Sequence, residues 1–578
     1  MAGDHAPRKG KLHLWMTAAV VVIAAVAGGA WLIQRTSDPA RSVILGEIVS
    51  PGSAAGFNVL LITLDTTRPD YLGCYGRRPT RTPTIDSLLD HGVRFDDAVT
   101  SVPLTLPAHA TLLTGLYPPT SGVRDNGQYQ LAPEFVTLAE VLQEQGYDTA
   151  AFIASFVLDR RFGLAQGFDL YDFEVDREIA KGPASLEHER RAHDVTTAAI
   201  HWLSARPKNG PTPPFFAWVH YFDPHAPYDS PLQVVESADA NPYEAEIAFV
   251  DLHLKRLLDA VDRLGLRDST LVALLSDHGE GLGQHQERLH GIFLYESTIR
   301  VAFLLSNPVL FDGPSRVDDR VVGLVDLMPT VLDLLGLPQP ERMDGLSLLE
   351  TNVPADRAIY IETIYPTNLG CSALRGLRRH TAKYIAAPRP EYYELDRDPA
   401  ELRNRHGVGG AALATLQRQL AEIDASWSPS QAEQSAQRAL SPEEQRKLAA
   451  LGYVSLGTSA ASAGLPDPKD RIGLVNEMTE VVQLLTEGDL ESALALATAL
   501  AAEAEDWTTP TLMAAEALMR LKRNDERIEL LAAFCARHPS AEMLYYLSHA
   551  LLAAERYEKC HRRLEQAQRL DPNFGAVS

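Results

Sequence analysis

The sequence predicts an α/β fold with a doubly wound sheet, followed by a smaller α-helical domain of repeated helices. Two observations carry this prediction. Short apolar runs that end in an acid alternate with helical segments, as in a sheet covered by helices on both faces. From about residue 466 the composition changes to short amphipathic helices. A chain of 578 residues is also long enough for two to four domains.

The first element is a predicted membrane anchor in residues 1–35. Leu14–Ile33 form an apolar stretch of about 20 residues, which is long enough to cross a bilayer and follows a basic flank. The flank predicts a cytoplasmic N-terminus. A cleaved signal peptide is the alternative, because small residues end the stretch. Either way, we expect a single-pass or exported protein whose catalytic part faces the periplasm or the extracellular side. Residues 36–56 are predicted to be a linker.

The net charge of −23 excludes one class of function. An acidic surface repels nucleic acid, so no nucleic-acid partner is expected. An anionic substrate would need concentrated positive charge at its site, such as a metal ion.

Three strands of the predicted sheet end in carboxylates. They are the runs NVLLITLD (58–65), FFAWVHYFD (215–223) and STLVALLSDHGE (269–280). Ligands of such sheets bind at the carboxyl ends of the strands, where Asp65, Asp223 and Asp277 would lie. A single acid at such a position could simply cap a helix, but three at one edge favour a site.

The acids and nearby histidines indicate a metal centre. Asp65 ends a buried strand, where an uncompensated carboxylate is costly. The segment SDHGEGLGQHQERLHG adds His278 next to Asp277, and then His285 and His290. Carboxylate and imidazole together suit zinc or manganese, with calcium or magnesium as alternatives.

Thr105 is the candidate nucleophile. In LTLPAHATLLTG it comes just before Pro107, which is tolerated in the first turn of a helix. Thr105 would then lie near a helix N-terminus, which favours anions. A plain capping role is the alternative. A nearby metal ion would lower the hydroxyl pKa and make the oxygen a nucleophile.

Six ordered segments within residues 57–405 resemble the sulfatase-like branch of the alkaline phosphatase superfamily. They are NVLLITLDTTRPDYLGCYG, TPTIDSLLDHGVRFDDAVT, LPAHATLLTGLYP, DPHAPY, SDHGEGLGQH and YYELDRDPAELRN. The resemblance implies an alkaline-phosphatase-like domain, a metal-centred site and attack on a sulfate or phosphate ester.

The sequence departs from true sulfatases at the positions that bind sulfate. Their cysteine or serine, which is oxidised to formylglycine, is replaced by Thr105, whose Cβ methyl prevents formation of the aldehyde. Their arginine is replaced by His109, and their lysine corresponds to Ser155. Most of the cationic clamp expected in a sulfatase is therefore missing.

The same region also resembles nucleotide pyrophosphatase/phosphodiesterases with a threonine nucleophile, through TLPAHATLLTGLYPPTSGVRDN. This resemblance implies that Asn126 donates to the transition state. It also implies a metal ion held by a fixed set of side chains. The implied ligands are Asp65, Thr105, Asp277 and His278.

Two further histidines keep alternative roles. His225 and His290, with Asp223, either hold a second metal ion or contact the ester group of the substrate. His109 is expected to orient a neighbour rather than react, and Arg124 is expected in a solvated loop.

The C-terminal third is predicted to contain repeats. Residues 406–465 are predicted to be an exposed helical connector. Residues 466–578 resemble tetratricopeptide repeats of about 34 residues, with Pro539 and Pro572 at equivalent places. A generic helical bundle is the alternative. Such repeats could bind a protein partner.

These observations predict a membrane-anchored, extracytoplasmic hydrolase or transferase that cleaves a phosphate ester through Thr105. A sulfuric ester hydrolase without formylglycine is one alternative. A non-catalytic scaffold that binds partners through its repeats is the other.

Overall fold

The structure is a computed structural model. It describes residues 40–77, 79–173, 189–207, 212–228, 241–354, 356–427, 444, 448, 464–504 and 508–571. The chain divides into two compact units, residues 1–42 and 43–578. The described part of the first unit is short and contains β1 (Arg41–Ser42). All elements discussed below belong to the second unit.

The predicted membrane localisation requires correction. No helix in the described ranges is both long and apolar enough to cross a bilayer. The segment Leu14–Ile33, on which the prediction rested, lies outside the described residues. The prediction of a single-pass membrane protein is therefore not retained.

The main sheet of the second unit is mixed. Its strands are β2 (Asn58–Leu64), β3 (Gly92–Phe95), β5 (Asp148–Phe152), β6 (Leu170–Asp172), β7 (Phe215–Tyr221), β8 (Thr270–Ser276), β9 (Phe303–Ser306) and β10 (Ser315–Val317). They lie in the order β10-β3-β9-β8-β2-β7-β5-β6. Within this order β9 runs antiparallel to both its neighbours, β3 and β8. Every residue of the central strands β2, β7 and β8 is buried, as their continuous apolar runs predict.

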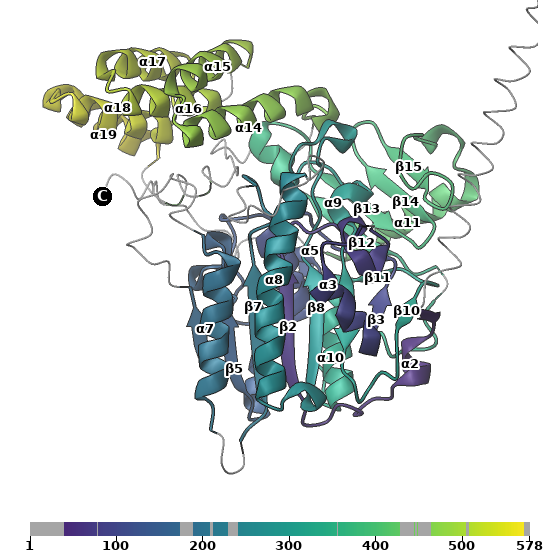
Figure 1. Cartoon of the computed structure of the whole chain (residues 1–578). Coiled ribbons are helices and arrows are strands. Elements are labelled where there is room, and N and C mark those ends of the chain that lie inside the picture. The colour runs from purple at the N-terminus through teal and green to yellow at the C-terminus, as the bar shows by residue number, and fades with distance from the viewer. Residues whose placement is uncertain are drawn as a thin grey trace, which may run out of the picture. The chain divides into compact units, whose positions relative to one another are not determined.

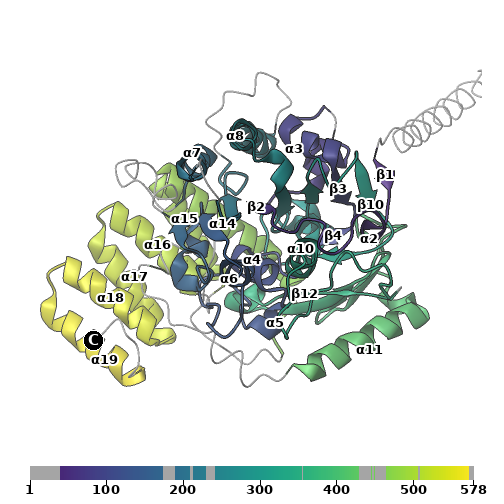
Figure 2. The same ribbon diagram turned by 90° about the horizontal axis from the view of Figure 1, so that it is seen from below.

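Helices cover both faces of the main sheet. On one face lie α3 (Pro83–Ser87), α7 (Ala192–Ala205) and α8 (Pro242–Arg263), and on the other lie α4 (Thr105–Thr114), α6 (Leu138–Glu144) and α10 (Leu327–Leu335) (Figures 1 and 2). The start of α6 is set by a capping box in which Thr137 and Glu140 bond each other's backbone N–H groups. This layered arrangement is the predicted α/β fold.

A second sheet follows in the chain. It is antiparallel, with β12 (Ile359–Thr363), β13 (Leu374–Arg378), β14 (Ala382–Ala386) and β15 (Glu391–Glu394) in chain order. The helix α11 (Gly410–Ser426) packs its buried Leu413, Leu416 and Leu420 against this sheet. The first part of the predicted connector 406–465 therefore contributes to a core, which its Ala- and Gln-rich composition does not reveal. Shorter elements are α2 (Leu45–Ile48), β4 (Ala98–Val99), α5 (Pro118–Ser121), α9 (Glu296–Ile299) and β11 (Val322–Gly323).

The C-terminal region is helical. It contains α14 (Ile472–Glu487), α15 (Leu490–Glu503), α16 (Thr508–Arg520), α17 (Asn524–Arg537), α18 (Ala541–Ala553) and α19 (Tyr557–Leu570). Each of these helices packs against the next one in the chain. Leu531, Phe534, Leu547 and Leu551 lie in a shared buried cluster.

Candidate active site

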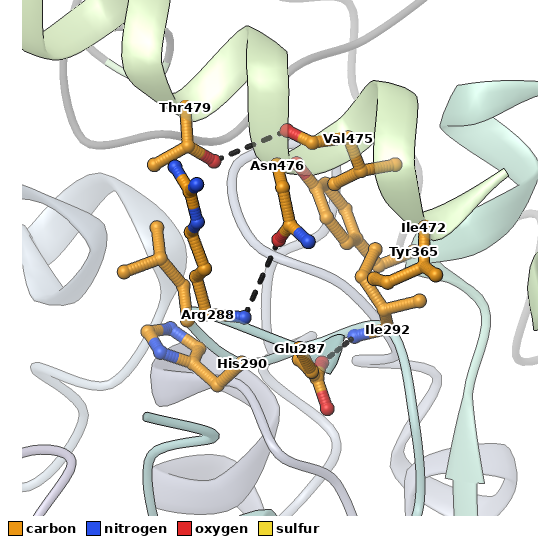
Figure 3. Close-up of a pocket in the computed structure, with 10 residues that line it drawn as sticks. Glu287, Arg288, His290, Ile292, Tyr365, Ile472, Val475, Asn476 and Thr479 are labelled. Carbon is orange, nitrogen blue, oxygen red and sulfur yellow. Dashed lines mark hydrogen bonds between the residues drawn. The ribbon is translucent and has the colours of Figure 1, made fainter. Parts of the chain in front are cut away.

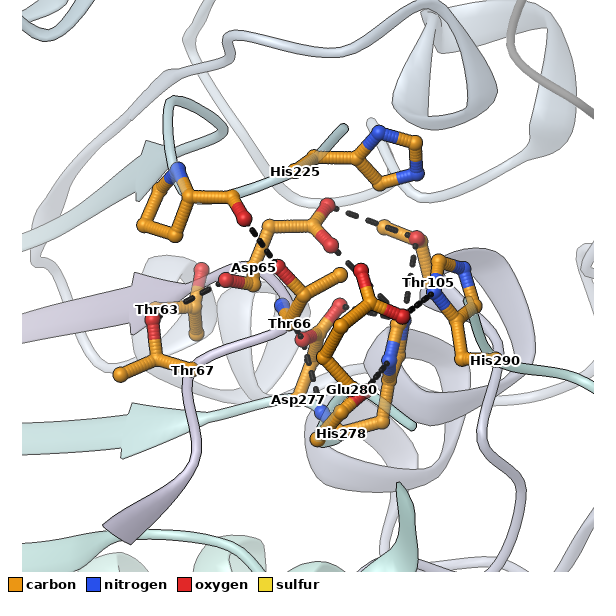
Figure 4. Close-up of polar contacts among 12 residues, drawn as sticks. Thr63, Asp65, Thr66, Thr67, Thr105, His225, Asp277, His278, Glu280 and His290 are labelled. Carbon is orange, nitrogen blue, oxygen red and sulfur yellow. Dashed lines mark hydrogen bonds and ion pairs between the residues drawn. The ribbon is translucent and has the colours of Figure 1, made fainter. Parts of the chain in front are cut away.

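The strand register brings Asp65 and Asp277 to the same edge of the sheet. Leu64 pairs with Tyr221 of β7 on one side and with Ser276 of β8 on the other. Asp65 directly follows β2 and Asp277 directly follows β8, so the two carboxylates lie side by side at this edge (Figure 4). This is the carboxyl edge at which α/β sheets bind ligands.

Asp65, Asp277 and His278 form a cluster that could hold a metal ion. One ligand atom from each side chain lies within 4.8 Å of the other two. The His278 Nε2 atom is 3.7 Å from Asp65 Oδ1 and 3.6 Å from Asp277 Oδ2. All three side chains are fully buried. Carboxylate oxygens and an imidazole nitrogen around one point are a typical set of divalent-metal ligands.

The polar atoms of this cluster need a cation. Asp65 Oδ1 and Asp277 Oδ2 are buried and have no hydrogen-bond partner among the described residues. Burial raises the pKa of Asp65 well above its usual value, and the charges of Asp277 and Glu280 raise it further. Burial also raises the pKa of Asp277. Two buried carboxylates with an unpaired oxygen each are costly unless a positive charge compensates them, so the side chains present fit a metal ion.

The remaining polar atoms of the cluster are oriented by backbone groups. His278 Nδ1 lies 3.0 Å from the carbonyl oxygen of Gly279 and must donate to it, which leaves Nε2 as an acceptor toward the cluster. Asp277 Oδ1 accepts from the N–H groups of His278 and Thr66 at 2.7 and 3.1 Å. Thr66 adopts a φ of 49°, which is rare for a β-branched residue and turns its N–H toward Asp277.

Thr105 lies at the first position of α4, next to the cluster. Its Oγ1 is 3.4 Å from Asp65 Oδ2 and 3.4 Å from His278 Nε2. The residue before the helix is Leu104, and no side-chain cap is made from that position. The N–H of Leu106 is instead bonded by Asn126 Oδ1 at 2.9 Å. The capping alternative for Thr105 is therefore not observed, and its hydroxyl faces the cluster.

Asn126 lies beside the first turn of α4 and has an unused amide donor. Because Oδ1 is used by Leu106, Nδ2 remains, and this atom is buried with no partner in the described parts of the chain. Asp125 holds the turn, since it accepts from the N–H of Asn126 at 2.8 Å and from Asn368 Nδ2 at 2.7 Å. A fixed N–H donor beside a nucleophile is the geometry expected of an oxyanion donor.

His225 and His290 lie beside the cluster of Asp65, Asp277 and His278 (Figure 4). The ring of His290 is centred 4.3 Å from that of His278 and 5.2 Å from that of His225. Burial lowers the pKa of His225 to about 3. Asp223, the proposed partner of these histidines in a second metal site, accepts instead from the N–H of Ala192 at the start of α7. Its other oxygen, Oδ1, is buried without a hydrogen-bond partner among the described residues. The group of Asp65, Asp277 and His278 does not include Asp223.

Several residues around the cluster were not singled out from the sequence. Glu280 is fully buried and lies 3.0 Å from His290 Nδ1 and 3.0 Å from the Tyr228 hydroxyl. His220 also adjoins the cluster, because its Nε2 lies 3.6 Å from Asp65 Oδ2. Its Nδ1 is hydrogen-bonded to Thr63 Oγ1, which in turn accepts from the Trp218 N–H. The alternation of side chains along β7 and β2 could have indicated His220, because it lies on a strand next to Asp65.

Three other residues have structural partners. His109 Nδ1 donates to the carbonyl oxygen of Thr105 at 2.7 Å, which agrees with the predicted orienting role. Burial lowers the pKa of His109 to about 4, so it is neutral at physiological pH. Arg124, expected in a solvated loop, forms a bidentate ion pair with the buried Glu362 at 2.9 and 2.6 Å. The half-buried His285 stacks on Tyr295, and its Nε2 lies 3.1 Å from the carbonyl oxygen of Ala400.

The comparisons with known proteins agree with this fold. Residues 57–337 match the family model described as Sulfatase. Residues 286–425 match the model described as N-sulphoglucosamine sulphohydrolase, C-terminal. The chain is 27% identical over 370 residues to the uncharacterized sulfatase YidJ of Escherichia coli, which covers 53% of this chain and 72% of that protein. It is 28% identical over 410 residues to the ulvan-active sulfatase of Formosa agariphila, with 63% and 79% covered.

Solved structures support the same fold. The phosphonate monoester hydrolase of Agrobacterium radiobacter aligns with a TM-score of 0.52 at 23% identity, over 64% of this chain and 95% of that chain. The putative sulfatase yidJ of Bacteroides fragilis gives a TM-score of 0.54 at 22% identity, over 67% and 98%. The matched region is thus a sulfatase-family domain with an alkaline-phosphatase-like fold. The protein is an ester hydrolase of the alkaline phosphatase and sulfatase superfamily.

Proposed function

We propose that this protein is a metal-dependent hydrolase or transferase that cleaves a phosphate ester with Thr105 as the nucleophile. The observation that carries this proposal is the position of Thr105 Oγ1, 3.4 Å from both Asp65 Oδ2 and His278 Nε2. A hydroxyl next to a set of metal ligands and at a helix N-terminus is suited to attack an anionic ester.

Asp65, Asp277 and His278, together with Thr105, would hold the metal ion. Zinc or manganese suits this mixture of oxygen and nitrogen ligands best, and calcium or magnesium is the alternative. When bound, such an ion lowers the pKa of the threonine hydroxyl and neutralises the charge of the ester.

The side chains of the site then have separate roles in two displacements. Thr105 Oγ1 loses its proton to solvent and attacks phosphorus, and the bond from phosphorus to the ester oxygen breaks with its electron pair on the departing alcohol oxygen. His290, held by Glu280, gives a proton to that oxygen, and His225 contacts the ester group. Asn126 Nδ2 donates to a phosphoryl oxygen. Water or an acceptor alcohol then gives its proton to His290 and attacks phosphorus. The bond from phosphorus to Thr105 Oγ1 breaks with its electron pair on Thr105.

The charge of the site favours an ester with a single negative charge. Arg124 is paired with Glu362, and Arg68 with Asp70, so these two guanidinium groups are already engaged. A phosphodiester carries one negative charge near neutral pH and needs less compensation than a phosphomonoester dianion.

A sulfuric ester is the second candidate substrate, because it too carries one charge and the relatives described above are named sulfatases. Against it, Thr105 cannot form the aldehyde that the sulfatase resemblance requires. A paired assay distinguishes the two candidates. Aryl phosphate monoesters, aryl phosphate diesters and an aryl sulfate are offered with zinc or manganese to wild type and Thr105→Ala. We expect the diester to be fastest and Thr105→Ala to lose turnover. Faster turnover of the sulfate would reverse the ranking.

For α14–α19 we propose tetratricopeptide-like repeats that bind a protein partner. The support is the sequential packing of these helices and their buried small and apolar residues. Copurification with wild type, but not with a variant altered on the exposed face of α19, would identify such a partner.

A further inference from the structure

A pocket lies between the loop that follows β8 and the first helix of the C-terminal region (Figure 3). The loop contributes Arg288, Leu289 and His290, and α14 contributes Ile472, Val475 and Asn476. The pocket is small and partly open to solvent.

The wall formed by α14 is fixed to the loop. Asn476 Nδ2 donates to the carbonyl oxygen of Gln286 at 2.7 Å, and Asn476 Oδ1 accepts from the N–H of Arg288 at 3.4 Å. The Arg288 guanidinium also lies 3.6 Å from the Glu480 carboxylate. One amide that bonds two backbone groups sets the position of the helix relative to the loop.

The segment that leads into α14 is fixed as well. Asp467 is buried and accepts from the N–H of Arg389 at 3.0 Å. Lys469 Nζ donates to the buried Glu391 carboxylate at 2.6 Å. The N–H of Ser372 donates to the carbonyl oxygen of Pro466 at 2.8 Å. These contacts place the start of α14 before any ligand binds.

His290 connects the pocket with the metal-ligand cluster. It lines the pocket, and its ring is centred 4.3 Å from the ring of His278. The loop keeps its shape because Glu287 Oε1 accepts from the N–H groups of Ile292 and Phe293 at 2.8 and 3.2 Å. The pocket therefore adjoins the imidazole of His290, beside which an ester oxygen would lie in the proposed function.

The lining is mixed, with an apolar wall on which a ring can pack. Leu289, Ile472 and Val475 provide apolar surface. Asn476 already bonds the loop, and the Thr479 hydroxyl donates to the carbonyl oxygen of Val475 at 3.2 Å. Polar groups of Glu287, Arg288 and His290 also line the pocket, so an apolar ring would gain from burial only against the apolar wall.

We infer that this pocket receives the ring-bearing alcohol portion of the ester, so that α14 helps to select the substrate. This inference rests on the proposed function, since it assumes that an ester reacts beside His290. It assigns the C-terminal region a direct part in the substrate site.

The test uses two inhibitors of the full-length, metal-loaded protein. Benzyl alcohol probes the pocket, and vanadate, a mimic of the phosphoryl group, probes the site around Thr105. The variant Val475→Trp fills the pocket, and Glu477→Trp places the same ring on an exposed position of the same helix, outside the pocket lining. Asn476→Ala releases α14 from the loop. Thermal melting checks that each variant is folded.

We expect benzyl alcohol to inhibit wild type and Glu477→Trp competitively. Its inhibition constant should rise about tenfold or more in Val475→Trp and in Asn476→Ala. Vanadate should inhibit all four proteins equally. Absence of inhibition by benzyl alcohol in wild type, or equal inhibition of wild type and folded Val475→Trp, would overturn the inference. Failure of the proposed function is recognised separately, by a Thr105→Ala variant that keeps its turnover.

Discussion

Thr105 Oγ1 donates a 3.4 Å hydrogen bond to Asp65 Oδ2, although the two residues are 40 positions apart. The first begins α4 and the second follows β2, so the contact depends on the packing of a helix against the edge of the sheet. Because Asp65 also belongs to the metal-ligand cluster, this contact joins the proposed nucleophile to the proposed metal site.

Removal of the Thr105 hydroxyl should abolish turnover. We expect Thr105→Ala and the shape-conserving Thr105→Val to lower kcat/KM on the order of 10³-fold or more, because the attacking oxygen is lost. Thr105→Ser keeps that oxygen and should retain measurable activity. Steady-state kinetics with an aryl phosphodiester provides the measurement. Near-normal turnover by Thr105→Val would exclude this residue as the nucleophile.

Removal of the metal should lower stability as well as activity. Without a cation, the carboxylates of Asp65 and Asp277 lie buried and uncompensated. We therefore expect a chelator to lower the Tm of wild type at neutral pH, and added zinc or manganese to restore it. Asp277→Asn removes one of the two charges, so its Tm should respond less to the chelator. Equal responses of wild type and variant in a melting experiment would contradict this role of Asp277.

Asn126 should act on the transition state. Loss of its free amide donor in Asn126→Ala is expected to lower kcat by about 10²- to 10³-fold. Metal content, measured by elemental analysis, should stay unchanged, because Asn126 does not belong to the ligand cluster. Since the same side chain also bonds the N–H of Leu106, Asn126→Asp serves as a control that keeps this acceptor. Asn126→Asp with the activity of wild type would contradict a donor role.

His290 should matter most for poor leaving groups. A proton donor is needed when the departing alcohol is a weak acid, and much less when it is a strong one. His290→Ala should therefore slow alkyl esters far more than 4-nitrophenyl esters. Glu280→Gln should show the same pattern more weakly, because Glu280 holds His290 through its Nδ1 atom. A uniform decrease across a series of leaving groups would indicate a role other than proton donation.

Asp125 should make stability depend on pH. Burial raises the pKa of this carboxyl to about 7 in the folded protein, from its ordinary value of 3.8. The folded state then binds the proton more tightly than the unfolded state. This tighter proton binding by Asp125 stabilises the folded protein fully below about pH 4, and the stabilisation is lost as pH rises to about 7. Asp125→Asn should remove this loss, and its amide can still accept from the N–H of Asn126.

Melting curves at several pH values test this prediction. Between about pH 5 and pH 8, the Tm of wild type should fall more than that of Asp125→Asn. Both proteins need the same metal content during the measurement, so that the metal site contributes equally. Parallel pH profiles would show that Asp125 does not titrate in this range.

The sequence best predicted those structural features whose physical signal lies within one short segment of the chain. The apolar runs ending at Asp65 and Asp277 predicted both the strands and the side of the sheet on which the site lies. Pro107 and the helical segment after it predicted the position of Thr105, which the structure places at the start of α4. Strands of this kind are buried on both faces, so their pattern is visible without tertiary information.

Other features depend on contacts between distant segments and have no local signal. Glu280 and His220 adjoin the cluster only because loops and strands converge there. Arg124 was expected in solvent because nothing nearby in the sequence marks its partner, Glu362. The wall that α14 adds to the pocket also depends on contacts across nearly 200 positions, such as that of Asn476 with the backbone of Gln286.

The most direct test of the account is to trap the covalent intermediate. Metal-loaded wild type is mixed with an aryl phosphate ester and quenched with acid during turnover, and its peptides are analysed by mass spectrometry. We predict a phosphoryl adduct on Thr105 that is absent from Thr105→Ala. A wild-type protein that turns over substrate without an adduct on Thr105, together with an active Thr105→Ala, would contradict the account.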